Sequence, residues 1–257
     1  MNLSRARAKL IPRLRQRRTR VREGAYLAEG VRCVAEVVDA GASVRFAVRS
    51  PRLLEVPGGA ELAAKLTDRG VEVIPADDSL LAQLAATETP QGVIAVCDEP
   101  QMDLAQPRRV LLADAIQDPG NLGTLIRSAA AFGVDAVIAL DGSVDPYNPK
   151  AVRASAGAIA RVPVTATSWN AVEEQLANWD LPLYCAAAGG DPGPVARGRW
   201  ALAIGNEGRG VRDSIRAAAT GGIAIPMAAD VDSLNAGVAG SILMYALSNA
   251  ETDLEEQ

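Results

Sequence analysis

The chain has 257 residues, of which 49% are hydrophobic, and a formal net charge of -5. This length and apolar content argue against a disordered chain and are sufficient for two compact domains. The sequence contains no histidine, which excludes imidazole as a catalytic base and every Ser-His-Asp or Cys-His arrangement. The three cysteines, Cys33, Cys97 and Cys185, fit neither a zinc site nor a disulfide framework, so we expect reduced core residues and no bound metal.

The N-terminus is strongly basic although the whole chain is acidic. Residues 1–22 contain nine lysines and arginines and no acidic residue. Such a block can neutralise several phosphates and release their counterions, whereas charge alone equally allows a solvated basic helix face. No apolar run has the length of a signal peptide or a membrane span, which predicts a cytoplasmic protein with no membrane partner. The candidate nucleic-acid contacts are Arg13, Arg15, Arg17, Arg18, Arg20 and Arg22.

Residues 1–98 are predicted to form a small α/β domain that includes the basic segment. Valines recur at near-helical spacing over residues 31–38 and Gly41 can end that helix. The remaining predicted elements are strands at Val44–Val48, Val71–Ile74 and Gly92–Cys97 and a short helix at Leu80–Ala86. Residues 99–109 lack periodicity and contain two prolines, which favours a linker.

Residues 110–257 are predicted to form a second α/β domain. The run VLLADAI is typical of a buried parallel strand, LGTLIRSAAAFG of a helix that Gly133 ends, and VDAVIAL of a second buried strand. Further strands are expected at Leu183–Ala187, Ala201–Ile204 and Ile223–Pro226, with a final helix of small residues at Ala236–Ser248. This alternation predicts a mostly parallel sheet with helices on both faces, and ligands bind such sheets at the carboxyl ends of the strands.

Three loops follow these strands. Asp118 precedes Pro119, as in a helix cap, and Arg127 then interrupts a helix that is otherwise small and apolar. Residues 205–210 read GNEGRG directly after a strand, where glycines let the backbone approach a ligand. The third loop runs from Ile225 to Asn235, and helix capping alone would also explain its last polar residues. The chain has no Gly-x-Gly-x-x-Gly or Walker A pattern, which disfavours NAD and ATP.

Together, in this order, the loops resemble the motifs of the SPOUT superfamily of RNA methyltransferases, in its SpoU/TrmH branch of 2'-O-ribose enzymes. DPGNLGTLIRSAAAFG is similar to the first motif, LAIGNEGRGV to the second and IAIPMAADVDSLNAGVAGSILMYAL to the third. The resemblance implies a parallel-sheet domain with a deep trefoil knot, which topology rules alone would not predict. It also implies S-adenosylmethionine as cofactor, a homodimer, and a preceding ribosomal-protein-like domain that binds RNA.

The resemblance also assigns roles to individual residues. Arg127 would be the central catalytic residue. The polar positions that would orient it, the ribose or the target phosphate are Asn121, Glu207, Ser233 and Asn235. The residues that would hold the cofactor, largely through backbone groups, are Gly205, Ile225 and Leu234. Because arginine normally stays protonated, the proton acceptor is either Arg127 assisted by the substrate phosphate, or a phosphate oxygen or Glu207.

The substrate class has alternatives. The separate N-terminal domain and its basic segment favour ribosomal RNA, because a large structured target benefits from an additional reader. A tRNA 2'-O-ribose methyltransferase is the first alternative. The second is a catalytically silent RNA-binding or ribosome-assembly factor with the same fold, which the intact polar residues of all three motifs disfavour.

Overall fold

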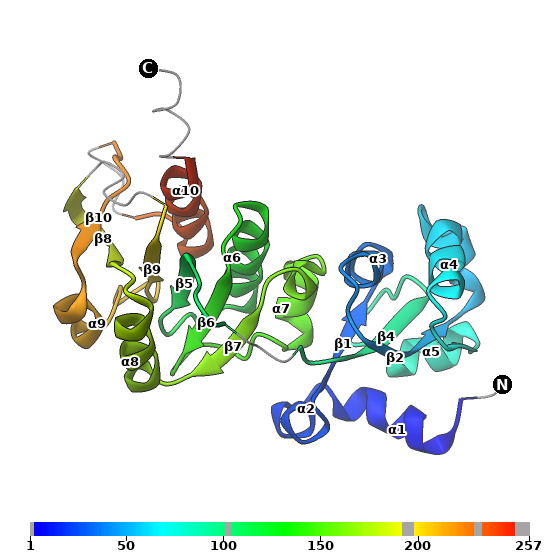
Figure 1. Cartoon of the computed structure of the whole chain (residues 1–257). Helices are drawn as coiled ribbons and strands as arrows, with labels where there is room; N and C mark the ends of the chain where they lie inside the picture. The colour runs from blue at the N-terminus through cyan, green and yellow to red at the C-terminus, as the bar shows by residue number, and fades with distance from the viewer. Residues whose placement is uncertain (1–2, 101–103, 192–197, 229–232, 250–257) are drawn as a thin grey trace. The chain divides into compact units, whose positions relative to one another are not determined.

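The computed structural model describes residues 3–100, 104–191, 198–228 and 233–249 (Figure 1). The chain divides into two compact units. The N-terminal unit comprises Met1–Gln101 and Tyr147–Arg161, and the C-terminal unit comprises Met102–Pro146 and Val162–Gln257. The segment Tyr147–Arg161 thus packs with the first unit although it lies within the stretch where we expected the second domain. Residues 101–103 of the expected linker lie outside the described residues.

A four-stranded mixed sheet forms the centre of the N-terminal unit. Its strands are β1 (Ala25–Glu29), β2 (Val44–Arg49), β3 (Val73–Pro75) and β4 (Val93–Asp98), in the order β1-β4-β2-β3. Strand β4 runs antiparallel to both of its neighbours, and β3 pairs parallel with β2. The strands expected near residues 44, 71 and 92 are therefore confirmed, and β1 is an addition to them.

Helices cover this sheet, and the basic segment itself folds into two of them. The helices are α1 (Arg5–Arg13), α2 (Arg17–Glu23), α3 (Val31–Asp39), α4 (Gly59–Asp68), α5 (Asp78–Leu84) and α7 (Pro149–Ala154), with 3-10 turns η1 (Pro51–Glu55) and η2 (Ala158–Ala160). Ile11 and Leu14 are fully buried in a cluster with Leu81 and Ile94, so apolar burial fixes the basic segment against the sheet. Helix α2 ends at Gly24, whose φ of 57° is one that side chains rarely adopt.

The C-terminal unit contains a six-stranded sheet. Its strands are β5 (Arg109–Ala113), β6 (Ala136–Leu140), β7 (Val164–Thr167), β8 (Leu183–Asp191), β9 (Trp200–Ile204) and β10 (Gly221–Ile223), in the order β10-β8-β9-β5-β6-β7. Every neighbouring pair is parallel. The predicted parallel sheet is confirmed, and β9 and β5 lie side by side at its centre.

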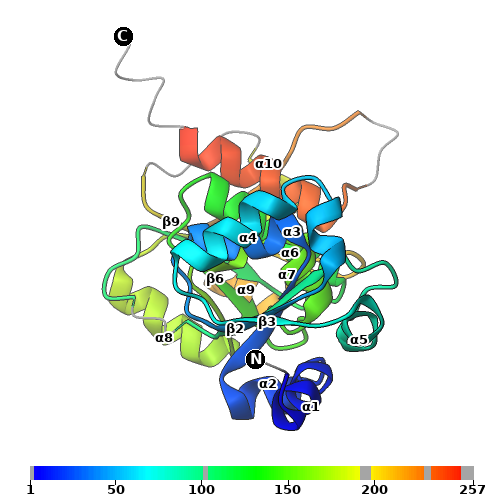
Figure 2. The same ribbon diagram turned by 90° about the vertical axis from the view of Figure 1, so that its right-hand side faces the viewer.

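Helices pack on both faces of this sheet (Figures 1 and 2). They are α6 (Pro119–Ala131), α8 (Trp169–Trp179), α9 (Asp213–Ala218) and α10 (Ala236–Asn249). Ala203 of β9 belongs to the core under α8 and α9, whereas its neighbour Ile204 faces α10, because side chains alternate along a strand. Helices α6 and α10 lie side by side. A Cβ at Gly240 would lie 2.3 Å from Leu125 Cδ2, so the predicted small residues of α10 do permit a close approach.

All three cysteines are buried and form no disulfide. Burial raises the pKa of the Cys33 thiol to about 12 and that of Cys185 to about 11, which keeps both protonated and unreactive. Within the described ranges, no cluster of acidic, cysteine or histidine side chains is arranged to hold a metal ion. Across the same ranges, no helix combines the length and the apolar character that crossing a bilayer requires.

Candidate active site

The carboxyl ends of β5 and β9 bring the first two predicted loops together. These strands pair in parallel over their whole length, so the chain leaves both of them at the same edge of the sheet. Beyond β5 the chain continues through residues 114–118 into α6, and beyond β9 it forms residues 205–212. The N–H of Asp114 donates to the Ile204 carbonyl at 2.8 Å, which holds the two exits next to each other.

A chain of side-chain hydrogen bonds connects all three motifs. The Asn121 amide donates from Nδ2 to Glu207 Oε1, and Asn235 Nδ2 donates to Asn121 Oδ1 at 2.7 Å. Asn121 is buried at the start of α6, whereas Glu207 and Asn235 are exposed, so the network reaches from the protein interior to the surface. Asn235 also accepts the Val238 N–H at 3.2 Å, which caps α10. The predicted polar positions Asn121, Glu207 and Asn235 therefore form one network.

Capping explains Asp118 fully. Its Oδ1 accepts the Asn121 N–H at 2.9 Å at the first turn of α6, with Pro119 at the first helical position. This bond fixes the backbone of Asn121, and through it the position of the network. Asp118 is thus a positioning residue for Asn121.

Residues 205–211 form a tight loop that a residue we did not predict holds in place. Asn206 Nδ2 donates to the Ala115 carbonyl at 3.1 Å, and its Oδ1 accepts the N–H groups of Gly208 and Arg209 at 3.0 and 3.3 Å. A Cβ at Gly205 would lie 2.1 Å from the carbonyl carbon of Gly210, so only glycine fits there. The sequence signal that could have identified Asn206 is its position between Gly205 and Glu207, both of which were predicted site residues.

A cavity of about 180 Å³ lies between this loop and the third motif. Three of its lining residues are the predicted cofactor contacts Gly205, Ile225 and Leu234, and Glu207 and Ser233 also line it. The remaining walls are mostly apolar: Ala186, Ala187, Ile204, Asn206, Gly210, Ile223, Met227, Ala236, Ala239 and Leu243. Residues 229–232 of the third motif lie outside the described residues. We call this space the cofactor cavity, after the prediction that Gly205, Ile225 and Leu234 hold the cofactor.

Arg127 lies apart from this network in the single chain. It is exposed on α6 and is not among the residues that line the cofactor cavity. Its guanidinium forms no hydrogen bond or ion pair with any residue that the structure describes. The predicted catalytic arginine is therefore available for a ligand or a second chain, whereas Asn121, Glu207 and Asn235 are positioned within one chain and Ser233 lines the cofactor cavity.

Two family models match the chain, one over each of the two predicted domains. A model of the SpoU rRNA methylase family matches residues 108–245, and a model of the MRM3-like substrate-binding domain matches residues 5–95.

The chain belongs to the SpoU rRNA methylase family.

Relatives and solved structures extend over nearly the whole chain. The 23S rRNA (guanosine(2553)-2'-O)-methyltransferase RlmP of Bacillus subtilis is 33% identical over 242 residues, 91% of this chain and 93% of that protein. The 23S rRNA (guanosine-2'-O-)-methyltransferase RlmB of Xanthomonas campestris is 31% identical, over 84% of this chain and 93% of that protein. The SpoU methyltransferase AviRb of Streptomyces viridochromogenes, solved with S-adenosylmethionine, has a TM-score of 0.83 at 28% identity and covers 97% of this chain and 99% of that one. The predicted fold class, a knotted SPOUT domain behind a smaller α/β domain, is confirmed by this similarity.

In the N-terminal unit of this SpoU protein, the predicted RNA-binding arginines fall into two groups. Arg20 is only 2% exposed and donates to the carbonyls of Leu14 and Arg15, each at 2.8 Å. Arg15 donates to the Leu84 carbonyl at 2.7 Å and so caps α5, and Arg22 pairs with Glu23 at 2.6 Å. Three others are exposed, and their side chains form no hydrogen bond with a described residue: Arg13, Arg17 and Arg18. Structural roles thus account for Arg20 and Arg15. RNA contact remains a prediction for the other arginines of the set, which are exposed.

Proposed function

We propose that this protein is an S-adenosylmethionine-dependent methyltransferase that modifies a ribose 2'-hydroxyl of ribosomal RNA. The observation that carries this proposal is the hydrogen-bonded chain Glu207–Asn121–Asn235 beside the cofactor cavity. A silent scaffold has no need to join the side chains of three separate loops through the buried amide of Asn121, because a buried polar group costs free energy unless it is satisfied. The ribosomal relatives support ribosomal RNA as the substrate over tRNA.

The residues of the cofactor cavity fit the proposed cofactor. Ile204, Ile225 and Leu234 provide apolar walls that suit a nucleoside ring, and Glu207 adds one carboxylate of opposite sign to a sulfonium group. Gly205 keeps its backbone exposed to the cavity, because no side chain fits beside Gly210. When bound, S-adenosylmethionine supplies an electrophilic methyl group for transfer to an oxygen.

The chain's own residues must then position the ribose and remove the hydroxyl proton. In-line transfer depends on holding the reacting oxygen close and aligned, which can supply several kcal/mol of rate acceleration. We propose that Arg127 clamps the phosphate beside the target ribose through its planar guanidinium. The proton passes to a phosphate oxygen or to Glu207, whose other role is to accept the Asn121 amide.

We further propose that the protein is a homodimer formed through α10. Val238, Ile242 and Tyr245 are 45%, 41% and 57% exposed and recur at the spacing of one helix face. An exposed apolar stripe of this kind marks a surface that binds another protein. Because Arg127 is exposed on the neighbouring α6, a second copy bound at α10 would bring another chain near it. The proposed active site is completed in this way.

The N-terminal unit is proposed to bind ribosomal RNA through the exposed arginines of α1 and α2. It matches a substrate-binding domain, and its basic helices are fixed to the sheet rather than free. We propose the cytoplasm as the place of action, which follows from the RNA substrate and not from any feature of the fold.

The test is transfer of tritiated methyl groups from S-adenosylmethionine to transcripts of 23S ribosomal RNA and of tRNA. We expect incorporation into the ribosomal transcript at a single nucleotide whose 3' linkage resists alkaline hydrolysis, because a methylated 2'-oxygen cannot attack the phosphate. The control is Leu234→Trp, which fills the cofactor cavity. Absence of calorimetric S-adenosylmethionine binding, with or without RNA, would instead establish the silent scaffold, and methylation of tRNA alone would replace the substrate class.

A further inference from the structure

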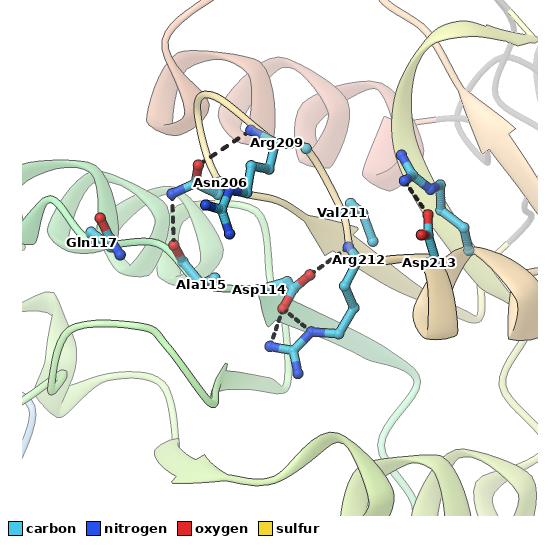
Figure 3. A pocket seen from close by; sticks show the side chains of 10 residues that line it. Asp114, Ala115, Gln117, Asn206, Arg209, Val211, Arg212 and Asp213 are labelled. Atoms are coloured by element: carbon cyan, nitrogen blue, oxygen red, sulfur yellow. Dashed lines mark hydrogen bonds and ion pairs between the residues drawn. The ribbon is translucent and has the colours of Figure 1, made fainter.

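A second cavity is lined in part by the loop formed by residues 205–211 (Figure 3). Its volume is about 580 Å³, and it opens between this loop and the chain that leaves β5. Asn206 and Gly210 line both this space and the cofactor cavity, so one loop contributes to both. Nothing in the chemistry proposed above uses this second space, which we call the arginine cavity.

An ion pair between Arg212 and the buried carboxylate of Asp114 builds one wall of the arginine cavity. Asp114 is 1% exposed, and its carboxylate accepts the Arg212 N–H at 2.8 Å and Arg212 Nε at 2.6 Å. Arg212 Nη2 also donates to the Asp141 carbonyl at 2.6 Å. These bonds fix the plane of the guanidinium. Its Nη1 group forms no hydrogen bond with a described residue, so two N–H donors remain for a ligand.

Arg209 is the charged residue of the cavity that is not paired with a lining aspartate. Three arginines and two aspartates line the space, and Arg212 pairs with Asp114 as Arg216 pairs with Asp213. The Arg209 side chain is exposed and forms no hydrogen bond with a described residue, while Asn206 Oδ1 holds its backbone N–H at 3.3 Å. The cavity thus presents one unpaired positive charge on a fixed loop, together with the free donors of Arg212.

We propose that the arginine cavity binds a phosphodiester group of the RNA chain adjacent to the nucleotide at the cofactor cavity. A phosphodiester carries one negative charge, which matches the single unpaired charge of Arg209. Guanidinium groups favour phosphate oxygens because their N–H donors form a planar fork. Since one loop forms a wall of both cavities, an RNA chain at the first passes close to the second. The choice of RNA as the ligand rests on the proposed function.

The arginine cavity would fix which nucleotide reaches the cofactor. Phosphate contacts carry no base information, yet they set the register of a nucleic acid on its protein. A phosphate contact at Arg209, two residues from Glu207 in the same loop, would therefore hold the target ribose relative to Glu207. We expect its loss to weaken RNA binding and to leave the cofactor cavity intact.

The test compares Arg209→Gln with wild type in filter binding to a 23S ribosomal RNA transcript between about 50 and 200 mM salt. We expect about tenfold weaker binding and a salt slope smaller by about one, as for one lost phosphate contact. Arg209→Lys should keep the slope because it keeps the charge. The matched control is Arg69→Gln, which removes one exposed charge at the end of α4. S-adenosylmethionine binding should be equal in all four proteins.

The proposal would be overturned if Arg209→Gln and wild type had the same RNA affinity and salt slope. It would also be overturned if Arg69→Gln lost as much RNA affinity as Arg209→Gln, or if the salt slope of Arg209→Lys were as small as that of Arg209→Gln. A second arm titrates inorganic phosphate by calorimetry. Phosphate binding that depends on Arg209, without any effect of Arg209→Gln on RNA, would assign the cavity to a small anion and overturn the RNA site. If the transcript binds but is never methylated, the proposed function fails and the binding series still decides this site.

Discussion

The two units use their polar side chains in different ways. In the C-terminal unit, Asn121 bonds side chains that lie 86 and 114 residues away in the sequence, so three loops share one network. In the N-terminal unit, Arg20 and Arg15 bond backbone carbonyls of nearby helix ends, and Arg7 pairs with Glu72 at a partly exposed position. Polar groups are therefore coupled to one another in the first case and largely independent in the second.

This difference predicts how substitutions combine. Residues that share a hydrogen-bond network show interaction energies of about 0.5–3 kcal/mol, whereas separated residues add within about 0.5 kcal/mol. Effects on the reaction should thus be large and non-additive in the C-terminal unit. Effects on RNA affinity should be small and additive in the N-terminal unit.

The largest effect is expected at Arg127. Because the proposed clamp needs the planar guanidinium, Arg127→Lys should lower kcat by about 10²- to 10⁴-fold although the charge remains. Calorimetric binding of S-adenosylmethionine should be unchanged, since Arg127 does not line the cofactor cavity. Single-turnover methylation of a 23S ribosomal RNA transcript measures the rate. Near-normal turnover of the lysine enzyme would contradict the clamp and both proton routes that depend on it.

The second-largest effect is expected from substitutions in the hydrogen-bond network. Asn121→Ala leaves Glu207 and Asn235 without their shared partner, which should cost about 1–3 kcal/mol of transition-state stabilisation, or roughly 5- to 150-fold in kcat/KM. Asn235→Ala should cost a similar amount. The double variant should cost much less than the sum of the two, and a double-mutant cycle on kcat/KM measures this. Additive losses would show that the network is not a functional unit.

A single methyl group at Gly205 should act on the cofactor. The added Cβ would lie 2.1 Å from the Gly210 carbonyl carbon and the Val211 nitrogen, so the loop must move. We expect Gly205→Ala to lower S-adenosylmethionine affinity by about tenfold and stability by about 1–3 kcal/mol. Calorimetry and thermal unfolding measure the two effects. Gly208→Ala is the matched control, because the nearest atom to its Cβ would be 3.6 Å away. Equal losses of affinity and stability in the two variants would show that the effect does not depend on the close approach at Gly205.

Periodicity and loop position carried the prediction of the C-terminal unit. A buried parallel strand is an apolar run, so residues 110–113, 136–140 and 201–204 were visible in the sequence. Strand β7 (Val164–Thr167) and helix α8 were missed, because VTAT is half polar and the helix begins without a break in composition. The network was implied by family resemblance, since hydrogen bonds between residues so distant in sequence leave no local pattern.

The N-terminal unit was harder to predict for a related reason. Strand β1 was missed because AYLAE is buried at all five positions and so shows no alternation. The charge pattern could not separate Arg20 from Arg18, because burial of Arg20 depends on how α1 turns into α2. The pairing of Asp114 with Arg212 was equally hidden, since the two residues are 98 positions apart.

The smallest effects are expected from the exposed arginines of the N-terminal unit. Arg17→Gln and Arg18→Gln should each weaken binding of a 23S ribosomal RNA transcript by about two- to fivefold, and the double variant should lose the sum in free energy. Each should reduce the salt slope by less than about one. Arg20→Met is the contrasting variant: it should lower the unfolding free energy by about 1–3 kcal/mol, because it removes the donor from the carbonyls of Leu14 and Arg15. The prediction is wrong if folded Arg20→Met binds RNA more weakly while Arg17→Gln and Arg18→Gln bind it as wild type does. RNA would then not contact the exposed arginines of α2.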